Sequence, residues 1–269
     1  NALAAADDIH LLKAWEGLGY YRRARMLRET ARAVVERHGG AFPREWAELL
    51  ELPGVGRYTA GAVRAFAFGL PGAVVDGNVA RVLARLMDFR EPVDTPAGRS
   101  HMQAWAEVLE RGGDPRIHNA ALMELGQTHC RPRAPDCGAC PVARYCQAGD
   151  PAALPVKRQR VPATAVDEHA VWRRDRRGRL LLTRESGTRR TGLWQLPLRA
   201  AAELDGLPLL ADTAYTITRY RVRLRVYQGC GGRRGCGEEW FAPDELAALP
   251  MAAPFRRVVE SLLESRRKA

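Results

Sequence analysis

The sequence predicts two domains, an all-α domain followed by an α+β domain. Up to about residue 128, apolar residues recur at helical spacing with short connections between the segments. Beyond a stretch rich in Pro, Ala and basic residues, the apolar period changes to two, as in strands. Four cysteines crowd together between these regions. We therefore expect an all-α domain over 1–149, a linker over 150–164 and an α+β domain over 165–269.

The charge of the chain favours a polyanionic partner. The chain has 269 residues, a formal net charge of +11 and a pI near 9.9. This charge favours nucleic acid over a membrane surface as the partner. No apolar run approaches the length of a membrane span. The first residues, NALAAADDIH, carry neither an initiator Met nor a signal-peptide core, so we expect residue 1 to lie inside a longer protein.

The first helices flank a turn rich in aromatic and basic residues. We expect one helix over 5–15 and another over 26–38, with the turn WEGLGYYRRAR between them. Tyr20 and Arg22 belong to this turn, where an aromatic ring can stack on a base and a guanidinium can neutralise a phosphate. The alternative is that the tyrosines pack a helix junction and the arginines are solvated.

A glycine-containing hairpin follows. Helices over 45–50 and from Arg57 onwards are predicted to flank LPGVG, in which Gly54 and Gly56 allow a positive φ and close backbone approach. The free amides at the start of the second helix favour an anion. By itself, LPGVG is also typical of an ordinary turn between helices.

A carboxylate interrupts the apolar run of VVDGN. Asp76 precedes the amphipathic segment NVARVLARL, for which we expect a helix to about Met87. This is a place for a partly buried functional acid, although most acids at a helix start serve as N-caps. Further helices are predicted over 99–110 and 116–128.

The cysteine segment indicates a metal centre. The cysteines are separated by six, two and five residues, so their thiolates can surround one centre. Zinc knuckles favour two short CxxC units, whereas this segment has one, and the spacing therefore favours a 4Fe-4S cluster over zinc. The expected ligands are Cys130, Cys137, Cys140 and Cys146. The remaining pair, Cys230 and Cys236, is expected to flank a loop between strands.

The C-terminal domain shows strand periodicity. Apolar and polar residues alternate in five segments, which predicts strands over 165–174, 178–185, 192–197, 214–220 and 222–229. Helices are expected over 243–249 and 254–267.

Several of these motifs together resemble one family. They are GLGYYRRAR, LPGVGRYTAGAV, VVDGNVARVLARL, ALMELGQTHC and the four-cysteine loop. The set resembles the adenine DNA glycosylases of the MutY family, in the helix-hairpin-helix and iron–sulfur superfamily that also contains endonuclease III. The resemblance is close over residues 3 to about 150. The remainder resembles that family's Nudix-like recognition domain more loosely, through GLWQLP, and it lacks a Glu-rich Nudix box, which implies recognition without hydrolysis.

The resemblance assigns roles to individual residues. Asp76 matches the family's catalytic aspartate, which would stabilise positive charge on the sugar, and Asn78 would support its geometry. Tyr58 stands where bifunctional relatives carry a lysine, and a phenol cannot form a Schiff base. The resemblance therefore implies that a base is flipped out and excised without strand cleavage.

The resemblance also implies a role in DNA binding for other positions. Tyr20 matches the family's intercalating tyrosine, and the hairpin amides would hold a phosphate. In the recognition loop, Ile217, Thr218 and Arg219 replace the family's Phe-Ser-His. The full set implied for DNA binding is Tyr20, Arg22, Leu52, Gly54, Val55, Gly56, Arg57, Thr218 and Arg219.

Two further departures concern excision itself. The family's general-acid glutamate lies upstream of the segment that matches Leu3 to Tyr21, so we expect this 269-residue polypeptide to be inactive without it. Ala120 occupies a position where the family usually carries Gln or Glu near the adenine pocket.

The expected function is that of a monofunctional glycosylase of base excision repair. It would hydrolyse the N-glycosidic bond of adenine mispaired with 8-oxoguanine or guanine. The resemblance implies a 4Fe-4S cluster, double-stranded DNA with a mismatched or damaged pair as the partner, a monomer, no membrane, and the bacterial cytoplasm beside the nucleoid. Two alternatives stay open: an endonuclease III-like glycosylase of other specificity, and a non-catalytic protein that binds damaged DNA.

Overall fold

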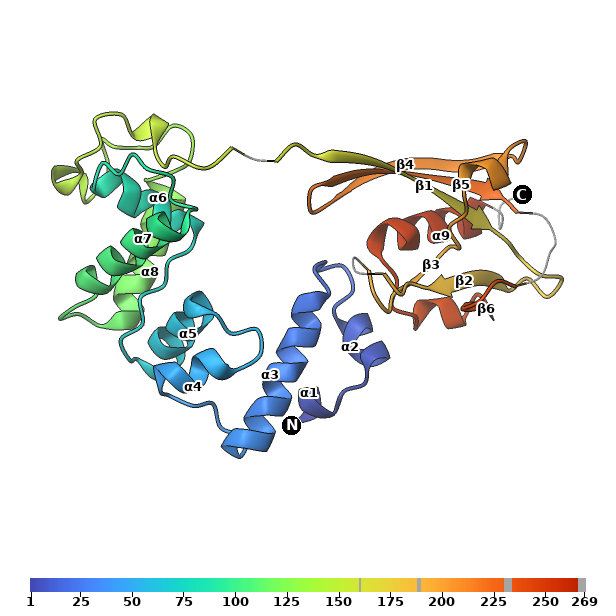
Figure 1. The fold of residues 1–269 in the computed structure, drawn as a ribbon, viewed down its shortest axis with the longest axis horizontal. Helices are drawn as coiled ribbons and strands as arrows, with labels where there is room; N and C mark the ends of the chain where they lie inside the picture. Colours follow the sequence, from blue (N-terminus) through green and yellow to red (C-terminus); the bar gives the residue numbers. More distant parts are fainter. Residues whose placement is uncertain (160, 188–189, 230–233, 266–269) are drawn as a thin grey trace. The chain divides into compact units, whose positions relative to one another are not determined.

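A computed structural model provides the structure of the protein. It describes all residues of the chain except 160, 188–189, 230–233 and 266–269. Cys230 lies outside the described residues, so its expected place in a loop stays a prediction. Figure 1 shows α-helices in the first half of the chain and strands in the second. The predicted fold class, all-α followed by α+β, is confirmed.

Helices occupy the chain up to residue 128. The α-helices are α1 (Ala2–Ala5), α2 (Asp8–Ala14), α3 (Arg22–His38), α4 (Trp46–Glu51), α5 (Arg57–Ala62), α6 (Gly77–Leu86), α7 (Pro96–Leu109) and α8 (Pro115–Thr128). A π-helical stretch continues α5, and two short 3₁₀ turns follow α8: η1 (Val63–Phe68), η2 (Ala143–Tyr145) and η3 (Pro151–Ala153).

The first predicted helix is interrupted, and the second begins early. The side chain of Asp7 accepts a hydrogen bond from the backbone N–H of His10, which starts a new helix inside the predicted span 5–15. The turn that follows ends at Tyr20, whose φ is +49°. Arginine is a good helix former, so α3 starts directly after this turn, at Arg22 rather than Met26.

Two sheets and one long helix form the C-terminal part. The strands are β1 (Thr164–Trp172), β2 (Leu180–Arg184), β3 (Trp194–Gln195), β4 (Leu209–Ile217), β5 (Tyr220–Gln228) and β6 (Glu238–Phe241). They make two three-stranded sheets, of order β1-β5-β4 and β3-β2-β6. β1 pairs with β5 in parallel, and the other pairs are antiparallel. The remaining elements are η4 (Ala201–Leu204), η5 (Glu245–Ala247) and α9 (Ala253–Ser265).

Two predicted elements of this part are shorter than expected. The helix predicted over 243–249 is wrong, because only the 3₁₀ turn η5 forms there. Pro250 disfavours the α conformation of the residue before it, and the remaining stretch is too short to offset the cost of helix nucleation. The strand predicted over 192–197 shrinks to β3, since Pro197 has no N–H to donate.

By its internal packing the chain falls into two compact units. One unit comprises Asn1–Arg32 together with Val161–Ala269, and the other comprises Ala33–Arg160. α3 begins in the first unit and ends in the second. The boundaries predicted for domains and linker stay a prediction.

Each unit has its own apolar core. In the first, residues of both sheets share one buried cluster with Phe255 of α9 and Leu12 of α2. In the second, Leu49, Leu52 and Ala60 pack the hairpin helices α4 and α5 against the end of α3. A separate cluster joins α6 to α7. The hairpin and the start of α6 therefore stand on buried, close-packed supports.

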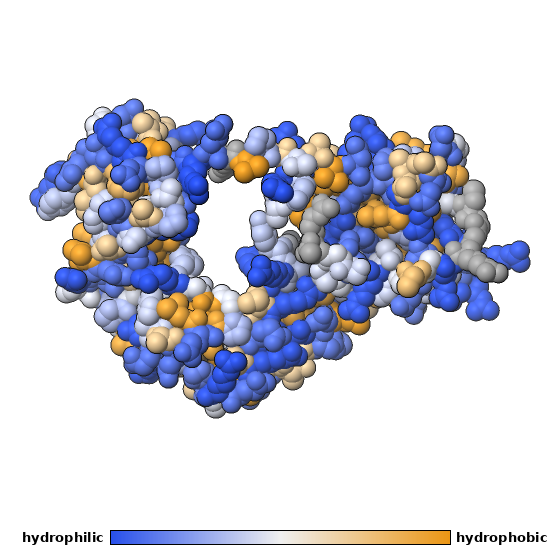
Figure 2. All heavy atoms as spheres, in the orientation of Figure 1, coloured by the Kyte–Doolittle hydropathy of each residue, from blue (hydrophilic) through white to orange (hydrophobic). Residues whose placement is uncertain are grey.

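The visible surface is mostly hydrophilic, with smaller apolar patches (Figure 2). This agrees with a chain in which 27% of the residues are charged. Within the part of the chain that the structure describes, none of the helices combines the length and apolar character needed to cross a bilayer.

Candidate active site and cysteine cavity

The hairpin between α4 and α5 is a tight, glycine-dependent turn. Leu52 is buried, and its carbonyl accepts a hydrogen bond from the N–H of Val55 at 3.1 Å. Gly54 has a φ of +77°, which a side chain would strain. Gly56 precedes α5, and a Cβ there would meet open space. The predicted phosphate contacts of these amides stay a prediction.

Asp76 is the N-cap of α6. Its Oδ1 accepts hydrogen bonds from the backbone N–H of Asn78 at 2.8 Å and of Val79 at 2.7 Å. Its Oδ2 lies 3.4 Å from Nδ2 of Asn78, a long hydrogen bond. The helix start therefore fixes one carboxylate oxygen. The other oxygen is engaged only weakly by the described residues.

Asp76 and Tyr58 line the same groove, which has a volume of about 770 Å³. Arg57 also lines it, whereas Asn78 and the hairpin residues before Arg57 do not. The groove thus gathers a carboxylate from the start of α6 with a guanidinium and a phenol from the first turn of α5. Further basic and polar groups on its wall, which sequence reasoning missed, are Arg99, Gln103 and Lys157.

Lys157 reaches this groove because the start of the predicted linker is bound to the loop between α6 and α7. The N–H of Val93 donates to the carbonyl of Val156 at 3.1 Å. The N–H of Arg158 donates to Oδ1 of Asp94 at 2.9 Å. The first bond joins two backbone groups and the second joins a backbone N–H to a side chain, so composition gave no signal of them.

Two buried arginines of α6 connect the start of this helix with the cysteine segment. Nη2 of Arg81 donates to Oδ1 of Asn78 at 3.0 Å and to the carbonyl of Gly126 at 2.6 Å. Its Nε donates to the carbonyl of Cys130 at 2.8 Å. Burial lowers the pKa of the Arg81 guanidinium. Arg85 is almost fully buried, and its Nη1 donates to Sγ of Cys130 at 3.2 Å.

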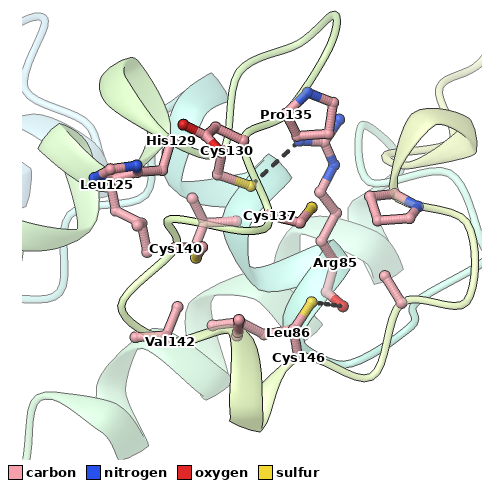
Figure 3. Close-up of a pocket in the computed structure, with 15 residues that line it drawn as sticks. Arg85, Leu86, Leu125, His129, Cys130, Pro135, Cys137, Cys140, Val142 and Cys146 are labelled. Atoms are coloured by element: carbon pink, nitrogen blue, oxygen red, sulfur yellow. Dashed lines mark hydrogen bonds between the residues drawn. The ribbon is translucent and has the colours of Figure 1, made fainter.

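The four predicted cysteine ligands line one cavity of about 170 Å³ (Figure 3). All four are free thiols, and Sγ of Cys146 donates to the carbonyl of Arg85 at 3.4 Å. Apolar side chains such as Leu86 and Val142 line it as well, together with Arg85, His129 and Asp136. As they stand, no three His, Cys, Asp or Glu side chains of the described residues are close enough together to hold a metal ion. Four unpaired thiols facing one cavity are nevertheless a donor set that fits a thiolate-bound centre.

A second cavity, of about 450 Å³, lies in the unit formed by 1–32 and 161–269. Tyr20 and Arg22 line it together with Ile217 and Thr218. Tyr20 is 67% exposed. Both Tyr20 and Thr218 have a positive φ, of +49° and +53°, which is uncommon outside glycine and frequent at binding sites. Arg219 does not line this cavity, and its guanidinium lies instead 5.3 Å from the ring centre of Tyr220.

A buried polar triad supports the wall of this second cavity. Arg190 donates to the two carboxylate oxygens of Glu168 at 2.9 and 3.0 Å and also donates to the hydroxyl of Tyr215. The Tyr215 hydroxyl donates to Glu168 at 2.8 Å. Burial raises the pKa of the Tyr215 phenol, which keeps it protonated. Sequence reasoning missed this triad, since its members come from three distant segments.

Comparisons with known proteins agree with the predicted family. The model of the HhH-GPD superfamily base excision DNA repair protein matches residues 1–106. The chain is 47% identical over 148 residues to the adenine DNA glycosylase of Homo sapiens. The aligned region covers 54% of this chain and 27% of that protein. The chain is 39% identical over 191 residues to the adenine DNA glycosylase of Mycolicibacterium smegmatis, covering 70% of this chain and 62% of that protein. It therefore spans only part of each relative.

A solved structure of a thermostable thymine-DNA glycosylase is also similar. It is 33% identical, covers 54% of this chain and 67% of its own, and has a TM-score of 0.49. The family model covers the segment that contains the hairpin, Tyr58 and Asp76. Residues 1–106 accordingly match the HhH-GPD superfamily of base excision DNA repair proteins, and the chain is similar to MutY-like adenine DNA glycosylases.

Proposed function

We propose that this protein is a monofunctional DNA glycosylase that hydrolyses the N-glycosidic bond of adenine mispaired with 8-oxoguanine or guanine. The observation that carries the proposal is the shared groove of Asp76 and Tyr58, directly beside the hairpin. The relatives named adenine DNA glycosylases support the choice of adenine. The partner is double-stranded DNA, which suits the net charge of +11.

The groove supplies the electrostatic part of the reaction. As the bond between the sugar and the base breaks, positive charge develops on the sugar, and a fixed carboxylate beside it lowers the barrier. Asp76 meets this need, because α6 holds its Oδ1 and leaves Oδ2 for the sugar. Adenine leaves as this bond breaks, and water adds to the anomeric carbon. The proton that adenine gains is balanced by the proton that this water loses. Tyr58 donates a hydrogen bond in the groove, and Asn78 keeps the carboxylate oriented through its own contact with Arg81.

The second cavity is the proposed reader of the opposite base. Tyr20 stacks on a base there, while Arg22 contacts phosphate and Thr218 supplies a hydroxyl. Because Arg219 does not line the cavity, its role is contact with the phosphate backbone outside it. All residues proposed to contact the duplex belong to one chain, so the proposed active form is a monomer. Its proposed location is the bacterial cytoplasm.

The function is tested with the full-length protein and a duplex that contains adenine opposite 8-oxoguanine. Incubation should leave the strand intact until it is heated in alkali, when it should break at the adenine. Breakage without alkali would contradict the monofunctional assignment and would point to the amine of Lys157, which lines the same groove. Absence of any breakage, with a thymine-glycol duplex cut instead, would favour the endonuclease III-like alternative. Tight binding to both duplexes without breakage would favour a non-catalytic protein.

The four cysteines are proposed to hold a 4Fe-4S cluster. Cys130, Cys137, Cys140 and Cys146 would supply all four thiolates, so no ligand position remains for substrate. The cluster would therefore anchor the loop that the Arg81 and Arg85 side chains contact.

Replacing one ligand should remove the cluster. We expect the purified protein to absorb at about 400 nm and to contain about four iron atoms per chain. Cys140→Ser should lower both values by more than half, because a lost thiolate opens the cluster. Cys236→Ser is the matched control, since this exposed cysteine lies apart from the cavity. A colourless wild-type protein that contains zinc would contradict the proposed cofactor.

A further inference from the structure

The segment that leads into Asp76, residues 69–75, forms neither a helix nor a strand. Side chains from neighbouring helices bind its backbone instead. Nε of Arg64 donates to the carbonyl of Pro71 at 2.9 Å. Nε2 of Gln103 lies 3.4 Å from the carbonyl of Ala73. The position of Asp76 therefore depends on side chains that are far from it in sequence.

Glu110, at the end of α7, binds this segment most directly. It is only 7% exposed. Its two carboxylate oxygens accept from the N–H of Gly72 at 2.9 and 3.1 Å. Among the described residues no ion pair involves Glu110, so hydrogen bonds are its main compensation for burial.

Asn119, in α8, completes the arrangement. It is 1% exposed. Its Oδ1 accepts from the N–H of Val74 at 2.8 Å, and its Nδ2 donates to the carbonyl of Gly72 at 3.2 Å. The same Nδ2 donates to Oε1 of Glu110 at 2.9 Å. These contacts fix the orientation of the amide, because its oxygen must face an N–H and its nitrogen must face acceptors.

The opposite side of the segment is fixed by α5. A Cβ on Gly61 would lie 2.7 Å from the carbonyl oxygen of Ala73, and a Cβ on Gly72 would lie 2.7 Å from the carbonyl oxygen of Gly61. Only glycine permits this approach. The helix that carries Tyr58 therefore packs directly on the segment that carries Asp76.

We propose that Glu110 and Asn119 are positioning residues that set the separation between Asp76 and Tyr58 across the groove. They hold the segment from one side while α5 holds it from the other. The inference rests on the proposed glycosylase function. Neither residue lines the groove, so neither is expected to touch the DNA. Their effect should thus fall on the rate of excision and not on the affinity for DNA.

A reciprocal exchange tests this inference. Asn119→Asp places a carboxylate where Nδ2 stands, 2.9 Å from the carboxylate of Glu110, and removes the donor to Gly72. The rate of excision at saturating enzyme should fall about 100-fold, as expected for a misplacement on the order of 1 Å, while the Kd for the duplex stays within about threefold. The double variant Glu110→Gln/Asn119→Asp restores one donor and one acceptor. The double variant should excise at least about tenfold faster than Asn119→Asp, since a donor again faces an acceptor.

Amide hydrogen exchange supplies a readout that does not depend on activity. The N–H groups of Gly72 and Val74 should exchange faster in Asn119→Asp and regain protection in the double variant. Gln127→Glu, at an exposed position of the same helix α8, is the control for the gain of one negative charge. If the wild type does not excise but these amides respond, the proposed function fails and the positioning stands. An unchanged rate in Asn119→Asp, a Kd that rises as much as the rate falls, or a double variant as slow as the single one would overturn the inference.

Discussion

Replacing Asp76 with Asn is expected to slow excision of adenine at least about a thousandfold, while binding of the mismatched duplex persists. The amide of Asn cannot carry the negative charge that stabilises the sugar cation. It can still accept the two backbone hydrogen bonds at the start of α6, because Asn is as good an N-cap as Asp. The substitution therefore separates the chemistry of the carboxylate from its structural role.

The measurement is the single-turnover rate of excision with enzyme in excess over a duplex carrying adenine opposite 8-oxoguanine. Asp114→Asn provides a matched control, because Asp114 caps α8 through the N–H groups of Arg116 and Ile117 in the same way. That control should excise at the wild-type rate. Equal rates for Asp76→Asn and the wild type would remove Asp76 from the mechanism and leave it as an N-cap alone.

Local pattern was sufficient to predict the parts of the site that follow one another in sequence. The apolar spacing on either side of LPGVG predicts two helices, and Gly54 indeed takes the positive φ that the turn requires. The two interpretations of Asp76 turned out to be compatible, since its carboxylate caps α6 and also lines the groove. The spacing of the cysteines likewise predicts that they share one cavity.

Residues that act through distant partners gave no such signal. Asn119 looks like an ordinary helical residue until its contacts with Gly72 and Val74 are seen. Composition places Lys157 in a linker, and the hydrogen bonds of its neighbours Val156 and Arg158 bring it to the groove. The helix predicted over 243–249 failed for a local reason that a single proline supplies. Sequence thus singled out Asp76 and Tyr58, which line one groove, but not the contacts that hold this groove in place.

Replacing Arg190 with Ala is expected to lower the free energy of unfolding by about 3 to 5 kcal/mol, because it leaves the carboxylate of Glu168 buried without its partner. Arg190 is 5% exposed and Glu168 is 6% exposed, so water cannot take over the lost contacts. The hydroxyl of Tyr215 would still donate to Glu168, but it carries no charge. The loss should appear in a urea titration followed by tryptophan fluorescence, to which the buried Trp172 and Trp194 contribute. Arg176→Ala, an exposed arginine in the turn after β1, should stay within about 0.5 kcal/mol of the wild type.

Removing the whole triad shows how much of this lost stability comes from the unpaired carboxylate and how much comes from lost packing. In Glu168→Leu/Arg190→Met/Tyr215→Phe no buried charge or hydroxyl remains unpaired, and buried ion pairs replaced by apolar side chains of similar size are often neutral in stability. The triple variant should therefore be more stable than Arg190→Ala alone, even though it carries more substitutions. If it is instead the less stable of the two, the attraction between Arg190 and Glu168 of β1 exceeds the desolvation cost of this ion pair. Arg190 and Tyr215 also line the second cavity, so the triple variant can separate stability from recognition. If the variant is stable but excises adenine equally from pairs with 8-oxoguanine and with guanine, this wall carries the discrimination of the opposite base.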